Sequence, residues 1–205
     1  MSTTIEFHYD FGSPNAYLVH KVITGIAATE GIDFEYVPIL LGGVFKATGN
    51  VSPAVALQGI RNKGEYQRSR HAAFAQTTAS NHQVPNPHFP VNTLKIMRGA
   101  TFARDKDYYA DYIDAMYRAM WEEARKMDED DLIAEALARA RLPADEIIKG
   151  MSDPSVKQAL IDATESSVAR GTFGSPTFFV GNEIFFGKDK LRDALEWAQS
   201  RFQSH

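Results

Sequence analysis

The residues of this sequence most suited to chemistry are two serine–proline pairs, Ser13-Pro14 and Ser175-Pro176. Ser13 follows a short apolar segment and opens a helix-like one, in "YDFGSPNAYL". The first turn of a helix has unpaired N–H groups and about half a positive charge, so it attracts anions. A simpler interpretation makes Ser13 the N-cap and Pro14 the first helical residue. The two interpretations are compatible, because a hydroxyl can accept one hydrogen bond and donate another.

The segments around Ser13 form a predicted strand–helix–strand unit. Alternating apolar residues predict a strand over 4–11, an apolar face predicts a helix over 14–31, and a second strand follows over 32–39. Strands joined by such a crossover are expected to be parallel. Ser13 therefore lies at the junction of the first strand and its helix.

The middle of the chain is predicted to be almost entirely helical, and strands return only near the end. A hairpin is predicted over 176–187, with its turn at Gly181-Asn182, and a helix over 188–202 closes the chain. The helical segments expected between the two strand-containing parts are 52–80 (one or two helices), 91–106, 107–127, 128–142 and 153–171.

This order of elements predicts an α/β fold with an insertion. Without the helical block, the order is β-α-β followed by β-β-α, which is that of thioredoxin. We therefore expect a discontinuous thioredoxin-like domain from residues 1–50 and 171–205, with an inserted all-helical domain over 51–170. In thioredoxin-like folds a cis-proline opens the third strand and faces the start of the first helix. Pro176 has that place, so the Ser175-Pro176 bond is predicted to be cis, opposite Ser13, with the Ser175 backbone open to an extended ligand.

The composition limits the possible classes of function. The chain has 205 residues, 44% hydrophobic and 23% charged, with a net charge of -4, which is ordinary for a globular protein and argues against nucleic-acid binding. No apolar segment has the length of a membrane span, and no secretory signal is recognisable. The absence of cysteine excludes disulfides and thiolate ligands and fits a cytoplasmic protein. His82 and His88 lie in a polar loop without a second pair of ligands, so no metal site is expected.

Several motifs together resemble one family. They are "YDFGSPNAYL", "PILLGGVFKATGN", "NKGEY", "PHFPVNTL" and "GSPTFFVGNEIFFGKDKL". The resemblance covers the whole chain and is to 2-hydroxychromene-2-carboxylate isomerases, glutathione-dependent enzymes of the DsbA-like superfamily that are close to kappa-class glutathione transferases. In DsbA-like oxidoreductases a Cys-x-x-Cys motif occupies the start of the first helix. Here Ser13 and Ala16 occupy those positions, which excludes disulfide exchange.

The resemblance implies a set of site residues. Ser13 would be the catalytic residue, donating to the sulfur of bound glutathione and favouring its thiolate. Lys63 would bind a glutathione carboxylate and Asp189 the ammonium of the γ-glutamyl end. The full glutathione-binding set implied by the resemblance is Ser13, Asn50, Lys63, Ser175, Pro176, Lys188 and Asp189, and no metal is implied.

Simpler roles are open for four of these residues, and two positions depart from the family pattern. Lys63 and Lys188 can be solvated surface groups, Asn50 can belong to a turn, and Asp189 can be a helix N-cap. Arg70 stands where the family often has an acidic residue, and Lys188 where relatives usually have a small or neutral polar one.

The implied activity is cis–trans isomerisation of 2-hydroxychromene-2-carboxylate or o-hydroxybenzylidenepyruvate-type intermediates of aromatic catabolism. The resemblance implies reversible addition of the glutathione thiolate to a conjugated carbon, rotation about the new single bond, and release. It also implies a homodimer. Two alternatives stay open, a kappa-like glutathione transferase or peroxidase that consumes glutathione, and a non-catalytic thioredoxin-like binding module.

Overall fold

The computed structural model describes residues 4–77 and 83–202, so His82 lies outside the described residues. Its centre is a four-stranded sheet with the order β2-β1-β3-β4. Strand β1 (Thr4–Tyr9) is parallel to β2 (Asp33–Pro38) and antiparallel to β3 (Thr177–Val180), which forms a hairpin with β4 (Glu183–Phe186). The predicted parallel unit and the predicted hairpin are both confirmed.

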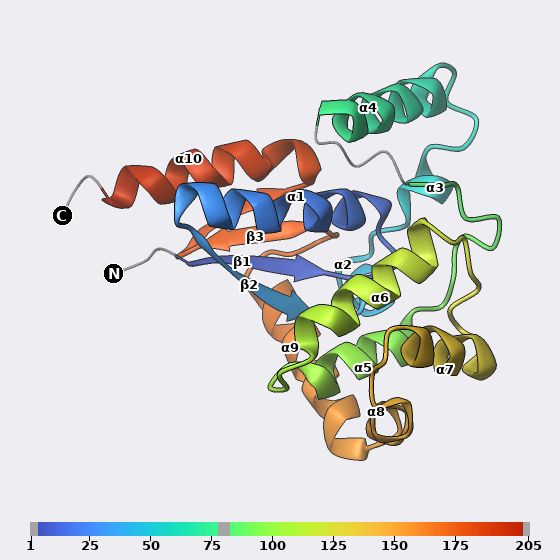
Figure 1. The fold of residues 1–205 in the computed structure, drawn as a ribbon. Coiled ribbons are helices and arrows are strands. Elements are labelled where there is room, and N and C mark those ends of the chain that lie inside the picture. Colours follow the sequence, from blue (N-terminus) through green and yellow to red (C-terminus); the bar gives the residue numbers. More distant parts are fainter. Residues whose placement is uncertain (1–3, 78–82, 203–205) are drawn as a thin grey trace.

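Helices cover both faces of the sheet. Helices α1 (Pro14–Glu30) and α10 (Leu191–Phe202) lie on one face, and α9 (Pro154–Ala169) lies on the other (Figure 1). Helix α1 ends at Gly31, whose φ of 64° is left-handed, a conformation that glycine adopts without steric cost. Strand β1 points toward the end of the molecule at which α1 begins, opposite the two chain termini (Figure 1).

The connecting helices largely follow the prediction, with four differences. The predicted helix over 52–80 is divided into α3 and α4, and a short 3₁₀ turn, η1, precedes α10. Helix α2 was not predicted, and α8 was not recognised as a separate helix, because each has only eight residues, which is about two turns and too short to show a repeated period. The bounds are α2 Leu41–Thr48, α3 Pro53–Ala56, α4 Lys63–Thr77, α5 Leu94–Ala103, α6 Tyr109–Trp121, α7 Asp130–Arg139, α8 Ala144–Met151 and η1 Lys188–Lys190.

One hydrophobic core joins the sheet to the connecting helices. In β1, Phe7 lies between Tyr36 and Phe178 on the two neighbouring strands, with ring centroids 5.0 and 5.7 Å away. Tyr9 continues this face to Tyr117 of α6, at 6.0 Å. The buried cluster then extends through α5, α7 and α8. The helical part therefore packs directly on the sheet, while the domain boundaries at residues 50 and 171 stay predictions.

No helix within the described part of the chain is both long enough and apolar enough to cross a membrane.

Candidate functional site

The hydroxyl of Ser13 is at the N-terminus of α1 and is hydrogen-bonded on both sides. The residue is 4% exposed. Its Oγ accepts a hydrogen bond from Ala16 N at 3.2 Å and donates one to the carbonyl oxygen of Ser175 at 2.8 Å. The Ser175-Pro176 peptide bond is cis. Two predictions are thereby confirmed: Ser13 caps the helix, and the cis peptide bond stands opposite it.

The cis peptide bond is held from two sides by the sheet. The Ser175 hydroxyl accepts a hydrogen bond from Asp10 N at 3.2 Å and donates one to His8 O at 3.4 Å. The Pro176 carbonyl accepts one from Gly187 N at 2.9 Å, which closes the β3–β4 hairpin. The Ser13–Ser175 contact therefore depends on the pairing of strands that are far apart in the sequence.

Asp10 is a buried residue of the candidate site that the sequence analysis missed. It is fully buried, and its carboxylate accepts hydrogen bonds from Gly12 N at 2.7 Å, Thr93 Oγ1 at 2.8 Å and Leu41 N at 2.7 Å. Burial raises the pKa of this carboxyl, and the three hydrogen bonds act against that rise. Asp10 thus joins the loop before Ser13 to the starts of α2 and α5. The available signal was an aspartate two residues before a glycine, which is the spacing of an Asx turn.

Lys188 and Asp189 form an ion pair beside α4. Lys188 is 4% exposed, and its Nζ lies 2.7 Å from Asp189 Oδ1 and 5.2 Å from the centre of the Phe74 ring. The Asp189 side chain is 58% exposed. A second cation, Arg70 of α4, lies beside it, with Nη2 3.7 Å from Asp189 Oδ1. The surface interpretation of Lys188 is therefore wrong, because its side chain is buried. The N-cap interpretation of Asp189 is also wrong, because this residue lies inside η1, where Gly187 is the N-cap.

Asn50 directly follows the turn at Gly49 and bridges two loops. Its Oδ1 accepts a hydrogen bond from Val51 N at 2.8 Å, and its Nδ2 donates one to Phe173 O at 2.9 Å. Phe173 is two residues before Ser175. Asn50 therefore fixes the chain after α2 against the segment that leads to the cis peptide bond.

Two polar groups, one at the start of α4 and one at the start of α1, have no hydrogen-bond partner among the described residues. Lys63 is the exposed first residue of α4, and within residues 4–77 and 83–202 its ammonium has no hydrogen bond or ion pair. Asn15, in the first turn of α1, has a buried Oδ1 without a hydrogen-bond partner. The Lys63 ammonium is therefore open to a ligand, whereas the Asn15 Oδ1 is unpaired but covered by the protein.

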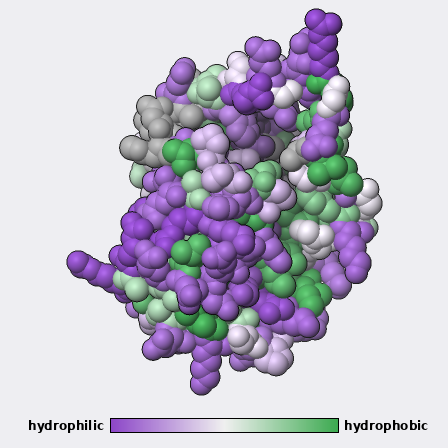
Figure 2. All heavy atoms as spheres, turned by 90° about the vertical axis from the view of Figure 1, so that its right-hand side faces the viewer, coloured by the Kyte–Doolittle hydropathy of each residue, from purple (hydrophilic) through white to green (hydrophobic). Residues whose placement is uncertain are grey.

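Apolar surface flanks this end of the molecule. The Phe173 and Phe186 rings are 43% and 41% exposed, and their centroids are 4.4 Å apart. Figure 2 looks onto the end where β1 leads into α1, and it shows hydrophobic side chains set into a mainly hydrophilic surface. With Lys63, Asp189 and the helix start, this surface can bind an extended molecule that carries charges of both signs and an anionic group.

The sheet order, the helix that starts directly after β1 and the cis-proline at the start of β3 define a thioredoxin class of fold. The chain matches the model of the DSBA-like thioredoxin domain over residues 4–196 and belongs to that family.

Two relatives and one solved structure are similar to this chain over most of its length. The chain is 27% identical over 199 residues to 2-hydroxychromene-2-carboxylate isomerase of Sphingobium xenophagum, with 96% of this chain and 97% of the relative covered. It is 25% identical over 202 residues to glutathione S-transferase kappa 1 of Rattus norvegicus, with 91% and 87% covered. A solved 2-hydroxychromene-2-carboxylate isomerase superposes with a TM-score of 0.83 at 25% identity, covering 97% and 95%. The resemblance seen in the sequence motifs is confirmed.

Proposed function

We propose that this chain is a glutathione-dependent cis–trans isomerase of 2-hydroxychromene-2-carboxylate and o-hydroxybenzylidenepyruvate-type compounds. Its similarity to isomerases and kappa-class transferases over nearly the whole chain supports an enzyme of this kind. The observation that carries the proposal is the contact between the Ser13 hydroxyl and the carbonyl of cis-linked Ser175, at the positive end of α1. A cytoplasmic location and a homodimer stay predictions.

A thiol at this helix start must come from a bound molecule, because the chain contains no cysteine. Glutathione supplies a thiolate nucleophile when it is bound. The residues present fit such a tripeptide. Lys63 has a free ammonium for a carboxylate, and Asp189 has an exposed carboxylate for an ammonium.

Ser13 has one hydroxyl proton, so its two possible partners compete. In the structure the Ser13 hydroxyl donates to the Ser175 carbonyl oxygen, and the two oxygens are 2.8 Å apart. For Ser13 to donate to a sulfur, its O–H must turn away from this carbonyl, which then becomes free to accept an amide N–H of the ligand. The cap at Ala16 N is unaffected, because it uses a lone pair of Oγ. Ligand binding and stabilisation of the thiolate are therefore coupled in one exchange of hydrogen bonds.

The other residues of the predicted set position these groups. Lys188 holds the Asp189 carboxylate through its buried ammonium, and Pro176 supplies the cis geometry that turns the Ser175 carbonyl toward Ser13. Asn50 fixes the segment before Ser175.

The proposal is tested by measuring isomerisation of 2-hydroxychromene-2-carboxylate with and without glutathione, while the glutathione concentration is followed. We expect turnover only with glutathione, and full recovery of glutathione afterwards. Loss of glutathione in proportion to product would show a transferase instead. No heat of binding with glutathione in calorimetry would leave only the non-catalytic module.

A further inference from the structure

A pocket of about 540 Å³ lies between α2, α5 and α9. Each helix contributes one face to it. Leu94 and Arg98 are four residues apart on α5, and Leu160 and Thr164 are four apart on α9, so each pair lies on one side of its helix. Much of the wall is apolar, and the volume is within the range of small-molecule sites, about 300–1,000 Å³.

The polar part of the pocket is mainly cationic. Lys46, Arg98 and Lys157 line it together with one carboxylate, Glu165. Within the residues that the structure describes, none of the three cations forms an ion pair. The Nε of Arg98 is in addition buried and lacks a hydrogen-bond partner. A buried guanidinium N–H without an acceptor is costly, so this position favours an anionic partner.

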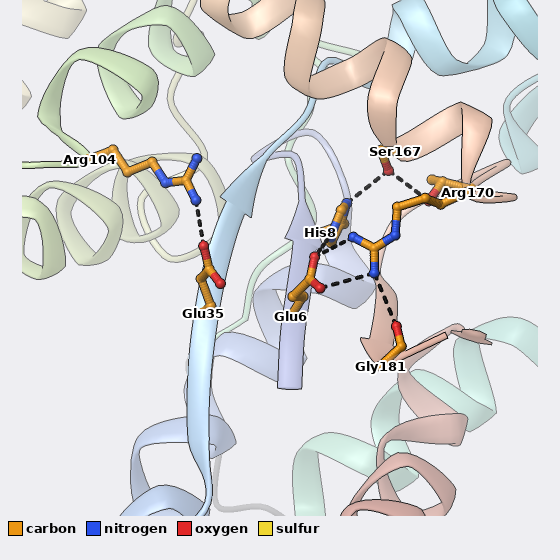
Figure 3. A network of polar contacts seen from close by, with 8 residues as sticks. Glu6, His8, Glu35, Arg104, Ser167, Arg170 and Gly181 are labelled. Carbon is orange, nitrogen blue, oxygen red and sulfur yellow. Dashed lines mark hydrogen bonds and ion pairs between the residues drawn. The ribbon is translucent and has the colours of Figure 1, made fainter. Parts of the chain in front are cut away.

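A second arginine near α5 contrasts with Arg98. Arg104, also near α5, lines a different pocket of about 470 Å³ together with Glu35. There Arg104 NH2 donates to Glu35 Oε1 at 2.5 Å, so its charge is compensated by the chain itself (Figure 3). The Arg98 pocket has no such internal compensation.

We propose that the pocket between α2, α5 and α9 binds an apolar monocarboxylate. Its flat aromatic or alicyclic body lies against Leu40, Leu94 and Ile161, and its carboxylate accepts hydrogen bonds from Arg98. A guanidinium presents parallel N–H donors that match the two oxygens of a carboxylate. Lys46 and Lys157 add positive charge around the same anion.

This inference does not depend on the proposed glutathione chemistry. None of the seven residues predicted to bind glutathione lines the pocket. Binding to it is therefore measured on the full chain without glutathione, and the result says nothing for or against isomerisation.

The test is calorimetry of the chain with 2-naphthoate and with its neutral analogue 2-naphthylmethanol. We expect 2-naphthoate to bind more than about tenfold more tightly than the alcohol, because a hydrogen bond to a charged group is lost with the alcohol. The Arg98→Met variant keeps a chain of similar length without the charge. It should weaken 2-naphthoate binding about ten- to a hundredfold and leave the alcohol unchanged. Arg192→Met is the matched control, since Arg192 has an 86% exposed side chain outside the pocket, and it should change neither affinity.

Equal affinity for acid and alcohol, or an equal loss of 2-naphthoate affinity with Arg98→Met and Arg192→Met, would overturn the proposal.

A second variant keeps the proposal testable if Arg98→Met does not fold. Ile161 is 37% exposed, so Ile161→Trp can fill the pocket from its outer edge without disturbing the core. It should abolish binding of both probes, and unchanged 2-naphthoate binding in this variant would show that the probe binds elsewhere.

Discussion

Strand β1 carries two polar clusters that use similar side chains and differ in what they leave open. The first is the Ser13 site, made of Ser13, Ser175 and Asp10 just beyond the end of the strand. The second is the His8 network, which lies within the strand against α9 (Figure 3). In this network His8 Nδ1 is 2.8 Å from Ser167 Oγ, and His8 Nε2 is 3.0 Å from Glu6 Oε2.

By residue type, the His8 network is the more catalytic of the two. Serine, histidine and glutamate are the members of a hydrolase triad. Yet Ser167 is 1% exposed, and its hydroxyl is shared with Thr172 Oγ1 at 2.7 Å. Arg170 donates to both oxygens of Glu6, at 2.6 and 3.0 Å. The polar groups of the network are hydrogen-bonded to one another, so the network holds β1 against α9.

Within the described residues, no histidine side chain is hydrogen-bonded to Ser13 or Ser175, but the Ser13 site keeps capacity for a ligand. The Lys63 ammonium and the Asn15 Oδ1 have no partner within the described residues, and the Asp189 carboxylate is half-exposed. Unpaired polar groups, more than the types of residue, therefore distinguish the candidate functional site from the His8 network. Five variants can break or sharpen this contrast.

The largest effect is expected at Asp10. Asp10→Ala leaves the buried donors of Gly12, Leu41 and Thr93 without an acceptor, and each such group costs about 1–3 kcal/mol. We expect the free energy of unfolding in urea to fall by about 3 kcal/mol or more. Asp107→Ala, at an exposed position, should change it by less than about 0.5 kcal/mol. Equal effects of the two variants would remove Asp10 from the Ser13 site.

Ser13→Ala should raise the thiol pKa of bound glutathione by about one to two units, or about 1.4–2.8 kcal/mol, because the sulfur loses one hydrogen bond. The thiolate fraction near neutral pH, and with it activity, should fall about ten- to a hundredfold and recover partly at higher pH. Thiolate absorbance against pH measures this. Ser167→Ala is the control from the other cluster and should leave the titration unchanged. If Ser13→Ala and the wild type titrate together, Ser13 is only a helix cap.

Ser167→Ala should instead lower stability, by about 1–3 kcal/mol, because it removes the buried partner of His8 and Thr172. Chemical denaturation measures the loss, and calorimetry should give an unchanged dissociation constant for glutathione. A large loss of glutathione affinity without a loss of stability would assign the His8 network a role in binding.

Asp189→Asn should weaken glutathione binding about tenfold, close to 1.4 kcal/mol, because the ligand ammonium loses a charged acceptor. Asparagine keeps one oxygen for the buried Lys188 ammonium, so folding should be little affected. Asp193→Asn is the matched control, with a 46% exposed side chain paired to Lys190, and it should bind glutathione normally. Identical dissociation constants for the two variants would mean that Asp189 serves Lys188 alone.

The smallest expected effect is a dependence of stability on pH. Burial lowers the pKa of His8 below its ordinary value of 6.5. Below about pH 6.5 the histidine is therefore protonated in the unfolded chain but still neutral in the folded chain, and this difference favours unfolding. Burial alone would raise the pKa of Glu6, but hydrogen bonds from Arg170 and His8 lower it overall, so its contribution to stability is lost at still lower pH. Both groups make the fold less stable in acid. The urea midpoint should fall between pH 7 and pH 5, and His8→Gln should flatten that slope. The same slope in both proteins would exclude His8 as a source.

Local patterns were sufficient for the elements and for the central pair of residues. The first serine–proline pair predicted a helix cap, which is a rule that acts over a few residues. The thioredoxin order of elements predicted that the Ser175-Pro176 bond would be cis and would stand opposite Ser13, and the chirality of crossover connections predicted the parallel strands before it. Asp10 was not found, since its partners Leu41 and Thr93 are 31 and 83 residues away along the chain. Its one local signal, the turn to Gly12, is too common to identify a site.

The sequence by itself determined the thioredoxin order of elements, the position of Ser13 at the helix start and the absence of a thiol in the chain. Only the tertiary structure decided which charges are compensated. In the folded chain Lys188 is buried and paired with Asp189, and His8 is hydrogen-bonded to Ser167. Arg98, in contrast, has no ion pair within the described residues. The reason is physical: periodicity and capping depend on neighbours in the chain, whereas the solvation and pairing of a charge depend on every element packed around it.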